Sequence, residues 1–357
     1  MGLKGARSNH VNAHMDLSEA VSYIAQAEGR RVRPITDEAE LDELDADVGH
    51  AVPVLDVKRD ALTGRLRVTG RLRAERHDNA PRLPMMAAWL EGAVLPMLGV
   101  GEGESDLVGA WRIELHDSYS YLNGRAGYRE ALSFGRAPES EQRRVALMPD
   151  PYHVGNFGGL LQRACRGLVV PWEKREPTLF FAGTTTGDRN PARNERIRAC
   201  VWSLGRRDIS RMHITNIAQM TYQAACAAWP TLPEVMHRPF EVEEHFSWRY
   251  QVNIAGNTAC WSRLPMVMAS GSLLVHARGG DSMWYYPLIR EREHYVASDS
   301  ADGHALAAAH SWCRANDADC QRIASMAARL AGDLFEPAVA ASYAAQLLLE
   351  AGSSGHA

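Results

Sequence analysis

The sequence lacks any long hydrophobic run. No stretch reaches the roughly 18 apolar residues that a membrane-spanning helix needs. The opening residues, MGLKGARSNHVNAH, have no apolar core of the kind found in a secretory signal, and Ala6 occupies the place where a myristoylation signal has Ser or Thr. We therefore expect a cytoplasmic protein without a transmembrane segment. A peripheral contact with the inner face of the membrane stays open.

Grouped cysteines and an excess of basic charge are absent as well. The six cysteines form no C-x-x-C pair and no Cys/His grouping with zinc-finger spacing, so buried, reduced thiols are the expected state. The 39 basic and 43 acidic residues give a formal charge of −4. This balance argues against nucleic acid as the main partner.

Length and composition indicate a soluble globular protein with more than one domain. The chain has 357 residues, whereas a single core stops growing at about 250–300 residues. The hydrophobic fraction of 46% and the charged fraction of 23% are ordinary for soluble domains. The sequence shows no internal repeat and no low-complexity tract.

Short apolar runs alternate with helical patterns from about residue 178 onward, which is typical of a parallel α/β layer. The residues before this point also contain strand and helix patterns. The expected fold class is therefore α/β, with two α/β units facing a cleft. We place an N-terminal domain at 1–170, a C-terminal domain at 171–335, and a final helix at 336–357 that packs back on the N-terminal domain. Ligands of such sheets bind beyond the carboxyl ends of the strands.

Three loops after expected strands carry unusual polar groups, and the first is ELHDSYSYL (114–122). Asp117 follows an apolar strand and has His116 and several tyrosines beside it. A carboxylate at the carboxyl end of a strand can act as a general base. Capping of a turn is the alternative role for this residue.

The second loop lies in FFAGTTTGDRNPARNERIR (180–198). Gly183 and Gly187 allow the backbone to approach a ligand, and the threonines between them offer hydroxyl groups. A helix that begins near Asn190 would favour an anion at its N-terminus, and Arg189, Arg193 and Arg196 add positive charge. The pattern resembles a phosphate cradle, although it is neither a Walker loop nor G-x-G-x-x-G. A solvated basic helix is the alternative.

The third loop opens NIAGNTACWSRLPMVMASGSLLV (253–275). It places Arg263 at the start of an apolar helix. A cation at a helix N-terminus opposes the helix dipole unless an anion lies between them. This position therefore indicates a phosphate site, with an arginine that extends to the surface as the alternative.

Four segments together resemble glycosyltransferase family 90, which includes the protein O-glucosyltransferases and the fungal capsule xylosyltransferases. The segments are PWEKREPTLFFAGTTTGDRNP, HFSWRYQVNIAGNTACWSRLPMVMASGSLLVH, YYPLIREREHYVAS and ANDADCQRIASMAARLA. They occur in the family's order, and the resemblance covers roughly residues 106–350. It is specific for the family and gives no information about the acceptor.

The resemblance implies a GT-B fold of two Rossmann-like domains facing a cleft. It also implies an inverting, metal-independent transfer from a UDP-sugar, with glucose or xylose as the sugar. It makes Asp117 the catalytic base and Arg263 the residue that holds the diphosphate. Many members have Arg where this chain has Ala182, and the glycine loop is one residue shorter than in the animal enzymes, so the second phosphate ligand is either Arg189 or Arg196. The remaining donor contacts implied by the resemblance are Gly183, Thr184, Thr258, Ala259, Cys260, Trp261 and Ser262.

The acceptor and metal expectations are less specific. Tyr119, Tyr152 and His153 are candidates for contacts with an acceptor, which is a glycan, a lipid-linked glycan such as a surface-polysaccharide precursor, or a protein; ordinary packing is the alternative. The pairs Asp45/Asp47 and Asp317/Asp319 match the Asp-x-Asp pattern of metal-dependent transferases, but they do not follow strands. We expect no metal and no cofactor. An NDP-sugar epimerase or phosphorylase of similar fold and a catalytically silent binding module are the rival functions.

Overall fold

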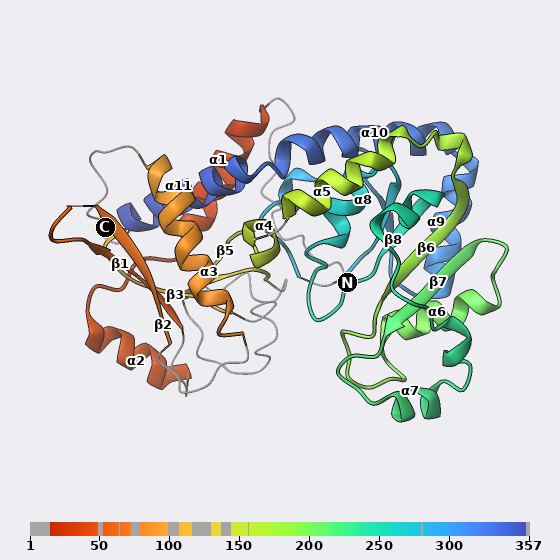
Figure 1. The fold of residues 1–357 in the computed structure, drawn as a ribbon, viewed down its shortest axis with the longest axis horizontal. Coiled ribbons are helices and arrows are strands. Elements are labelled where there is room, and N and C mark those ends of the chain that lie inside the picture. The colour runs from red at the N-terminus through yellow and green to blue at the C-terminus, as the bar shows by residue number, and fades with distance from the viewer. Residues whose placement is uncertain are drawn as a thin grey trace, which may run out of the picture. The chain divides into compact units, whose positions relative to one another are not determined.

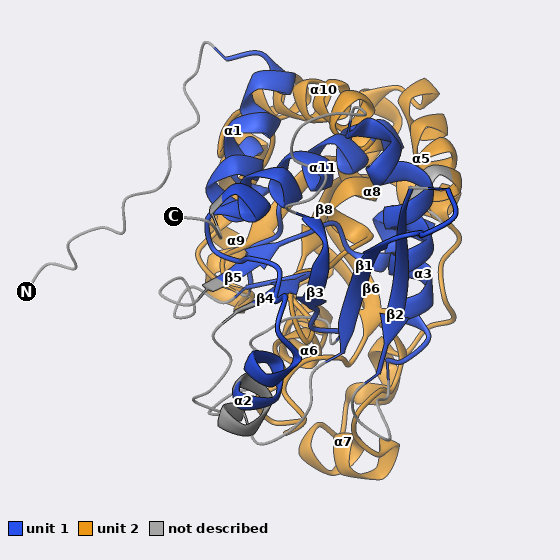
Figure 2. Ribbon diagram, turned by 90° about the vertical axis from the view of Figure 1, so that its left-hand side faces the viewer, with its two compact units in different colours: residues 1–155, 281–288, 336–357 blue, residues 156–280, 289–335 orange. Residues whose placement is uncertain are grey.

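The computed structural model describes residues 15–48, 53–63, 65–72, 79–98, 107–115, 130–136, 144–155, 157–279 and 281–354. The chain divides into two compact units. Unit 1 comprises residues 1–155, 281–288 and 336–357, and unit 2 comprises residues 156–280 and 289–335 (Figure 2).

Unit 2 is built on a five-stranded sheet in which every neighbouring pair of strands is parallel. The α/β class with a parallel sheet is therefore confirmed. The strands are β6 (Glu176–Thr184), β7 (Ser210–Asn216), β8 (Trp248–Asn253), β9 (Leu273–Ala277) and β10 (Val296–Ser298), in the order β10-β9-β8-β6-β7 (Figure 1).

The central strands of unit 2 carry buried apolar side chains on both faces because helices pack on both sides of the sheet. Phe181, Tyr250, Val252 and Val275 are all fully buried. The helices of this unit are α5 (Phe157–Cys165), α6 (Glu195–Leu204), α7 (Tyr222–Ala228), α8 (Arg263–Ala269), α9 (Gly303–Ala315) and α10 (Asp317–Leu334). Helix α8 packs on α5 and α10, whereas α6 packs on α9.

The strand order reverses at β6. The chain passes from β6 to β7 on one side and then returns to place β8 on the other side of β6. Such a reversal is the topological switch point of an open α/β sheet, where the loops after the two central strands separate and leave space for a ligand. The loops after β6 and β8 are the second and third loops singled out in the sequence.

The amino ends of the same strands are closed by a polar network around Asp317 in the first turn of α10. Its carboxylate accepts hydrogen bonds from Arg249 at 3.0 Å, from the Tyr250 hydroxyl at 3.0 Å and from the Trp172 indole at 3.1 Å. Asp319 forms an ion pair with Arg322 at 3.4 Å. This Asp-x-Asp pair therefore has structural partners, and it lies away from the carboxyl edge of the sheet.

Unit 1 differs from the expected Rossmann-like layer. Its strands β1 (Val54–Arg59), β2 (Leu66–Arg71) and β3 (Gly109–Arg112) form an antiparallel sheet of order β2-β1-β3. Only β4 (Glu130–Ser133) and β5 (Arg144–Leu147) are a parallel pair among the strands that the structure describes here. A tight turn explains the antiparallel pairing, because Asp60 accepts hydrogen bonds from the backbone N–H groups of Leu62 and Thr63.

The helices of unit 1 come from both ends of the chain. They are α1 (Leu17–Gly29), α2 (Glu38–Val48), α3 (Arg82–Trp89), α4 (Pro151–Gly155) and α11 (Pro337–Ser354). Helix α1 packs on α11 so closely that a Cβ atom on Gly29 would lie 2.5 Å from the carbonyl oxygen of Leu347. A buried ion pair between Glu28 and Arg136, 2.6 Å long, connects α1 to the end of the β4 segment.

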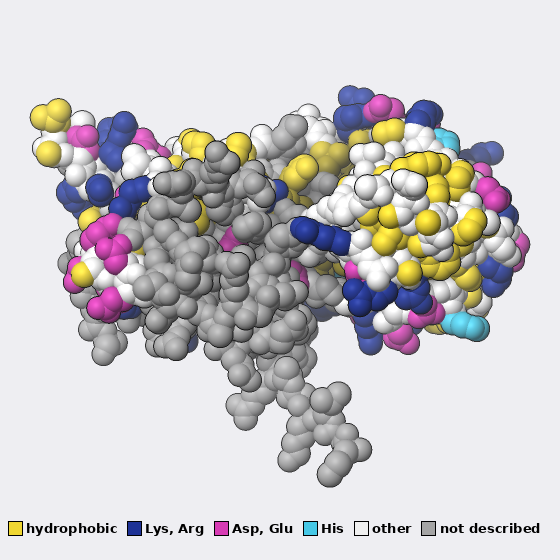
Figure 3. Space-filling view, turned by 90° about the horizontal axis from the view of Figure 1, so that it is seen from below, with side chains coloured by type: hydrophobic (Ala, Val, Ile, Leu, Met, Phe, Trp, Pro, Cys, Tyr) yellow, Lys and Arg dark blue, Asp and Glu magenta, His cyan; other side chains and the backbone are white. Residues whose placement is uncertain are grey.

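None of the described helices is both long enough and apolar enough to cross a membrane. Unit 2 shows exposed apolar side chains when it is seen from below (Figure 3). Helix α7 is the lowest element of this unit in Figure 1. Residues 212–233, which include α7, contain no acidic residue, lysine or arginine. Within this run Tyr222 is 51% exposed.

Candidate functional site

The loops after β6 and β8 meet at the carboxyl edge of the unit 2 sheet, and Arg263 lies between them. Its Nη2 donates a short hydrogen bond to the carbonyl oxygen of Ala182 on β6. Its guanidinium carbon lies 4.4 Å from the centroid of the Phe181 ring. Arg263 is the first residue of α8, and no side chain caps that helix, since Ser262 makes no capping hydrogen bond. The sequence expectation of a cation at this helix start is thus met.

The environment of Arg263 is unfavourable for a cation without a ligand. Burial lowers the pKa of Arg263 to about 10; the positive charge of Arg196 acts in the same direction, and Cys260 opposes the shift. The buried Nε of Arg263 has no hydrogen-bond partner among the described residues. A buried guanidinium with an unused donor is stabilised by an anion that accepts from it.

Gly183 gives Arg263 the room that it occupies. A Cβ atom built on Gly183 would lie 2.9 Å from Nη2 of Arg263 and 2.9 Å from the Phe181 ring. Real Cβ contacts are longer than this, so any larger residue would displace one of the two side chains. The glycine is therefore required by the arginine, in addition to any close approach of a ligand.

Arg196 on α6 also lies near Phe181, with its guanidinium carbon 5.8 Å from the ring centroid. It donates from Nη1 to the Thr186 hydroxyl at 2.6 Å and from Nη2 to the Ile254 carbonyl at 3.0 Å. These bonds join the loop after β6 to the loop after β8. The site therefore contains two cations, of which only Arg196 is fully engaged by protein acceptors.

The loop after β6 is held in a defined conformation. The Thr184 and Thr186 hydroxyls lie 3.2 Å apart. Gly187 has a φ of 128°, which favours glycine, and its N–H donates to the Asn257 side chain at 3.1 Å. Asn194 caps α6 by accepting from the Ile197 N–H at 3.1 Å. Helix α6 thus begins at Glu195, later than the helix start expected near residue 191.

The loop after β8 is packed rather than open. Thr258, Ala259 and Trp261 are buried, and Cys260 is half-buried with its thiol donating to the Ile254 carbonyl at 3.1 Å. The structure brings these residues to the same edge of the sheet as Gly183 and Thr184. Arg189, in contrast, is exposed at the outer end of the loop after β6.

The acceptor-side residues fall in unit 1. Asp117, Tyr119 and the neighbouring His116 lie outside the described residues. Tyr152 is 52% exposed. His153 is buried beside Asp150.

Asp150 and His153 form a pair that sequence reasoning missed. The Asp150 carboxylate lies 2.7 Å from Nδ1 of His153, and both side chains are buried. The same carboxylate accepts from the Tyr152 N–H at 2.9 Å, so it also caps α4. The rings of Trp284 and Tyr285 lie 5.7 Å from the imidazole. In this setting His153 has structural partners, and its contact with an acceptor stays a prediction.

Phe181 was also missed. In the sequence it is the second of two adjacent phenylalanines in an apolar run, which predicts a core position, and it is fully buried. Its distinguishing feature is the pair of guanidinium groups over its ring, which only the fold brings together. No sequence signal separates it from Phe180, which stacks on Trp248 at 3.7 Å on the same strand.

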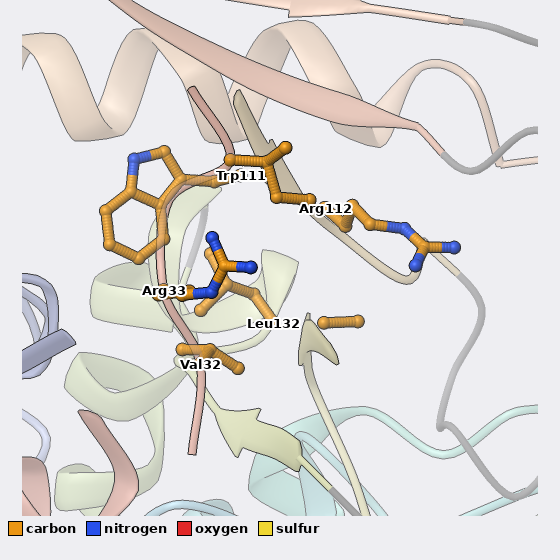
Figure 4. Close-up of a pocket in the computed structure, with 7 residues that line it drawn as sticks. Val32, Arg33, Trp111, Arg112 and Leu132 are labelled. Carbon is orange, nitrogen blue, oxygen red and sulfur yellow. The ribbon is translucent and has the colours of Figure 1, made fainter. Parts of the chain in front are cut away.

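A small pocket lies in unit 1 (Figure 4). Arg33 faces Trp111 across it, while the guanidinium of Arg112 extends away from that of Arg33. Arg33 is neutralised by an ion pair with Glu40. This pocket is therefore a weaker candidate for an anion site than the loops after β6 and β8 in unit 2. Its lining residues are Val32, Arg33, Ile35, Trp111, Arg112, Ala131 and Leu132.

The described part of the chain contains no group of three or more His, Cys, Asp or Glu side chains that could hold a metal ion. The side chains of Asp45 and Asp47 lie outside the described residues. Asp317 accepts hydrogen bonds from Arg249, Tyr250 and Trp172, and Asp319 is paired with Arg322.

Comparison with known proteins gives a match to the family described as glycosyl transferase family 90 over residues 161–353. Two viral proteins are also similar. Uncharacterized protein 179R of Invertebrate iridescent virus 6 is 28% identical over 190 residues, covering 44% of this chain and 15% of that protein. Uncharacterized protein 035R of Invertebrate iridescent virus 3 is 27% identical over 168 residues, covering 45% and 15%. The chain thus spans only a small part of the length of each viral relative.

Solved structures with some similarity include Anabaena Alr3699/HepE in complex with UDP and glucose, with a TM-score of 0.35, 11% identity, and coverage of 51% of this chain and 50% of that one. Sucrose-phosphate synthase from Thermosynechococcus elongatus has a TM-score of 0.33 and 14% identity, with coverage of 50% and 46%. Similarity at this level supports no conclusion about substrate.

The family match covers more than half of the chain. It includes the loop after β6, the loop after β8 and both arginines that flank Phe181. The sequence resemblance is confirmed by this match, and the chain belongs to glycosyl transferase family 90, a family of sugar-transferring enzymes.

Proposed function

We propose that this family 90 glycosyltransferase moves glucose or xylose from a UDP-sugar to a hydroxyl group of a glycan, a lipid-linked glycan or a protein. The single observation that carries the proposal is the position of Arg263. Its buried guanidinium, with an unused Nε, lies at the switch point of the sheet beside a glycine that makes room for it. A nucleotide diphosphate supplies the anion that such a site lacks.

The proposed transfer releases UDP, and negative charge develops on its β-phosphate as the sugar leaves. Fixed cations that are already in place stabilise this charge without reorganisation at the moment of reaction. Arg263 is the proposed direct ligand, with Gly183, Thr184 and the segment 258–262 around it. The N-terminus of α8 adds its dipole to the same point. Arg189 and Arg196 are the two candidates for a second cation.

The resemblance to the family supplies the rest of the mechanism. Asp117 takes the proton from the acceptor hydroxyl, whose oxygen attacks the anomeric carbon from the face opposite UDP. One displacement of this kind breaks the bond to UDP, forms the new glycosidic bond and inverts the configuration. Tyr152, which is exposed, remains a proposed acceptor contact.

We also propose that the transfer needs no metal. The engaged Asp317 supports this, because the network with Arg249, Tyr250 and Trp172 already uses its carboxylate. Activity is expected to survive excess EDTA. Complete loss that Mn²⁺ restores would show that a metal acts in the reaction.

The experiment that tests the function begins with thermal shifts of the chain in the presence of UDP-glucose, UDP-xylose and other UDP-sugars. Release of UDP is then measured with and without a glycan acceptor. A transferase releases UDP much faster when the acceptor is present, whereas an epimerase releases none and a silent binding module shows a shift without release. Absence of any shift with the whole UDP-sugar panel would overturn the proposal.

A further inference from the structure

Arg196 uses its whole hydrogen-bonding capacity on the protein. A guanidinium has five N–H donors. Nε donates to the Ala255 carbonyl at 3.0 Å, with the Ile254 carbonyl at 3.3 Å. Nη1 donates to the Thr186 hydroxyl at 2.6 Å and to the Thr184 carbonyl at 3.2 Å.

The remaining nitrogen, Nη2, donates to the Ile254 carbonyl at 3.0 Å and to the Cys260 sulfur at 2.9 Å. The acceptors belong to two loops that are far apart in sequence. One loop comprises residues 184–186 after β6, and the other comprises residues 254–260 after β8. A single buried side chain therefore connects the two walls of the candidate donor site.

This arrangement separates the roles of the two arginines over Phe181. A phosphate that bound Arg196 would have to displace acceptors that the protein already provides, and the displaced buried carbonyls would lose their partners. Arg263 has a buried Nε without a hydrogen-bond partner among the residues that the structure describes, and it needs no such exchange. Gly256 confirms how closely Arg196 is enclosed, since a Cβ atom there would lie 2.9 Å from Nη2 and 2.8 Å from the Thr186 hydroxyl.

We propose that Arg196 is a positioning residue that locks the loops after β6 and β8 together before the donor arrives, and that it does not bind the diphosphate itself. The connection between the two loops rests on the hydrogen bonds of Arg196 alone. Its effect on donor binding rests on the proposed function. A preorganised site spends less binding free energy on ordering its loops. Arg196 thus contributes to donor affinity through Thr184, Thr186 and Cys260.

The structural part is tested without any nucleotide. Amide hydrogen exchange is measured for the full chain and for Arg196→Met and Arg196→Lys. Both variants should exchange faster in peptides that contain residues 184–186 and 254–260, because neither side chain can bridge the two loops. Arg198→Met, at an exposed position of the same helix α6, is the matched control and should exchange like the wild type. Unchanged exchange in both Arg196 variants would overturn the proposal.

The functional part uses calorimetric binding of UDP by the same proteins. Arg196→Met and Arg196→Lys should both bind UDP about tenfold or more weakly, because the loops must then be ordered on binding. A lysine that restores wild-type affinity would mean that Arg196 acts as a point charge on phosphate, which overturns the proposal. If the wild type binds no UDP, the proposed function fails, while the exchange result still decides whether Arg196 locks the loops.

Thr186→Val provides a second variant should the Arg196 variants fail to fold. It removes one acceptor of Arg196 and keeps the shape of the side chain. Exchange should increase in residues 254–260, although the substitution lies in the other loop. An effect confined to residues 184–186 would contradict the connection.

Discussion

The guanidinium group of Arg263 stacks on Phe181, with 4.4 Å between its central carbon and the ring centroid. The ring lies at the base of the site, and Arg196 approaches it from its own helix at 5.8 Å. The negative face of an aromatic ring attracts a cation, which offsets part of the burial of Arg263. Under the proposed function, a bound diphosphate would offset the remaining cost of holding two like charges near one ring.

Arg263→Ala should weaken the binding of UDP strongly. A charge-assisted hydrogen bond to phosphate in a partly buried site contributes about 1.5–3 kcal/mol, which corresponds to a loss of affinity of roughly 10- to 150-fold. Calorimetry with UDP measures the change. Arg206→Ala, which removes an exposed arginine paired with Asp208 in the same unit, is the control and should leave the affinity unchanged. Wild-type affinity in a folded Arg263→Ala variant would remove this residue from the donor site.

Gly183→Ala should reduce donor affinity without contact between the new methyl group and the donor. The methyl group would meet Nη2 of Arg263 at 2.9 Å and push the guanidinium from its position over Phe181. Gly332→Ala is the matched control, because no atom lies within 4 Å of a Cβ atom there. That substitution in α10 should raise stability by about 0.5–1 kcal/mol and leave UDP binding unchanged. Equal affinities in the two variants would refute the role of Gly183.

Asp117→Asn keeps the shape of the side chain and removes the proton acceptor. Turnover should fall by about 10²–10⁴, the usual contribution of general acid–base catalysis, while UDP affinity stays close to that of the wild type. The rise of transfer rate with pH through a carboxylate range should also disappear. Asp333→Asn, an exposed position in α10, should behave as the wild type. A wild-type transfer rate in Asp117→Asn would place the base elsewhere, with Glu114 and His116 as the next residues to test.

The stability of unit 2 should decrease as the pH falls from about 6.5 to 4. Burial, aided by the charge of Arg263, lowers the pKa of His245 from 6.5 to about 4, so that in this window the unfolded state binds the proton and the native state does not. One such proton changes the free energy of unfolding by at most about 1.4 kcal/mol per pH unit. Urea titrations between pH 4.5 and 7 measure the slope.

His245→Asn should reduce that slope and leave the contributions of His213 and His276, whose pKa values burial also lowers to about 4. The substitution affects the bond between Nδ1 of His245 and the Gln251 side chain, which is 3.1 Å long. The variant should therefore be less stable at pH 7 while losing less stability on acidification. A slope identical to that of the wild type would contradict the lowered pKa, since it would show that His245 binds its proton over the same pH range in the native and unfolded states.

The parallel sheet of unit 2 could be predicted from the sequence because short apolar runs alternate with helical patterns along this part of the chain. The run from Leu179 to Phe181, for example, lies in β6 as expected. For unit 1 the sequence predicted strands around a turn but not how all of its strands pair. Strand pairing depends on contacts between segments that are far apart in the sequence, and a local pattern does not show them. Helix α6 was placed too early, since Asn194 rather than Asn190 provides the cap.

The order of strand, glycine-containing loop and apolar helix predicted that Arg263 begins a helix, as it does. The conflict between its charge and the helix dipole then indicated a phosphate site. The sequence could not separate Arg196 from Arg189, because the two differ in what surrounds them and not in their sequence context. Arg196 lies on the inner face of α6 and is buried, whereas Arg189 is exposed. Asp117 lies outside the described residues, so its role as the base stays a prediction from the family.

The packing of α1 on α11 has a consequence for how the protein is made. Arg30 and Glu350, which form an ion pair 2.7 Å long at this contact, are 320 residues apart. A ribosome that adds roughly 5–20 residues per second needs tens of seconds to cover that interval. During this time the apolar face of α1, including Val21 and Ile24, has been synthesised but its partner has not. Unit 1 therefore closes only after α11 has been translated, and α1 is a candidate client for a chaperone until then.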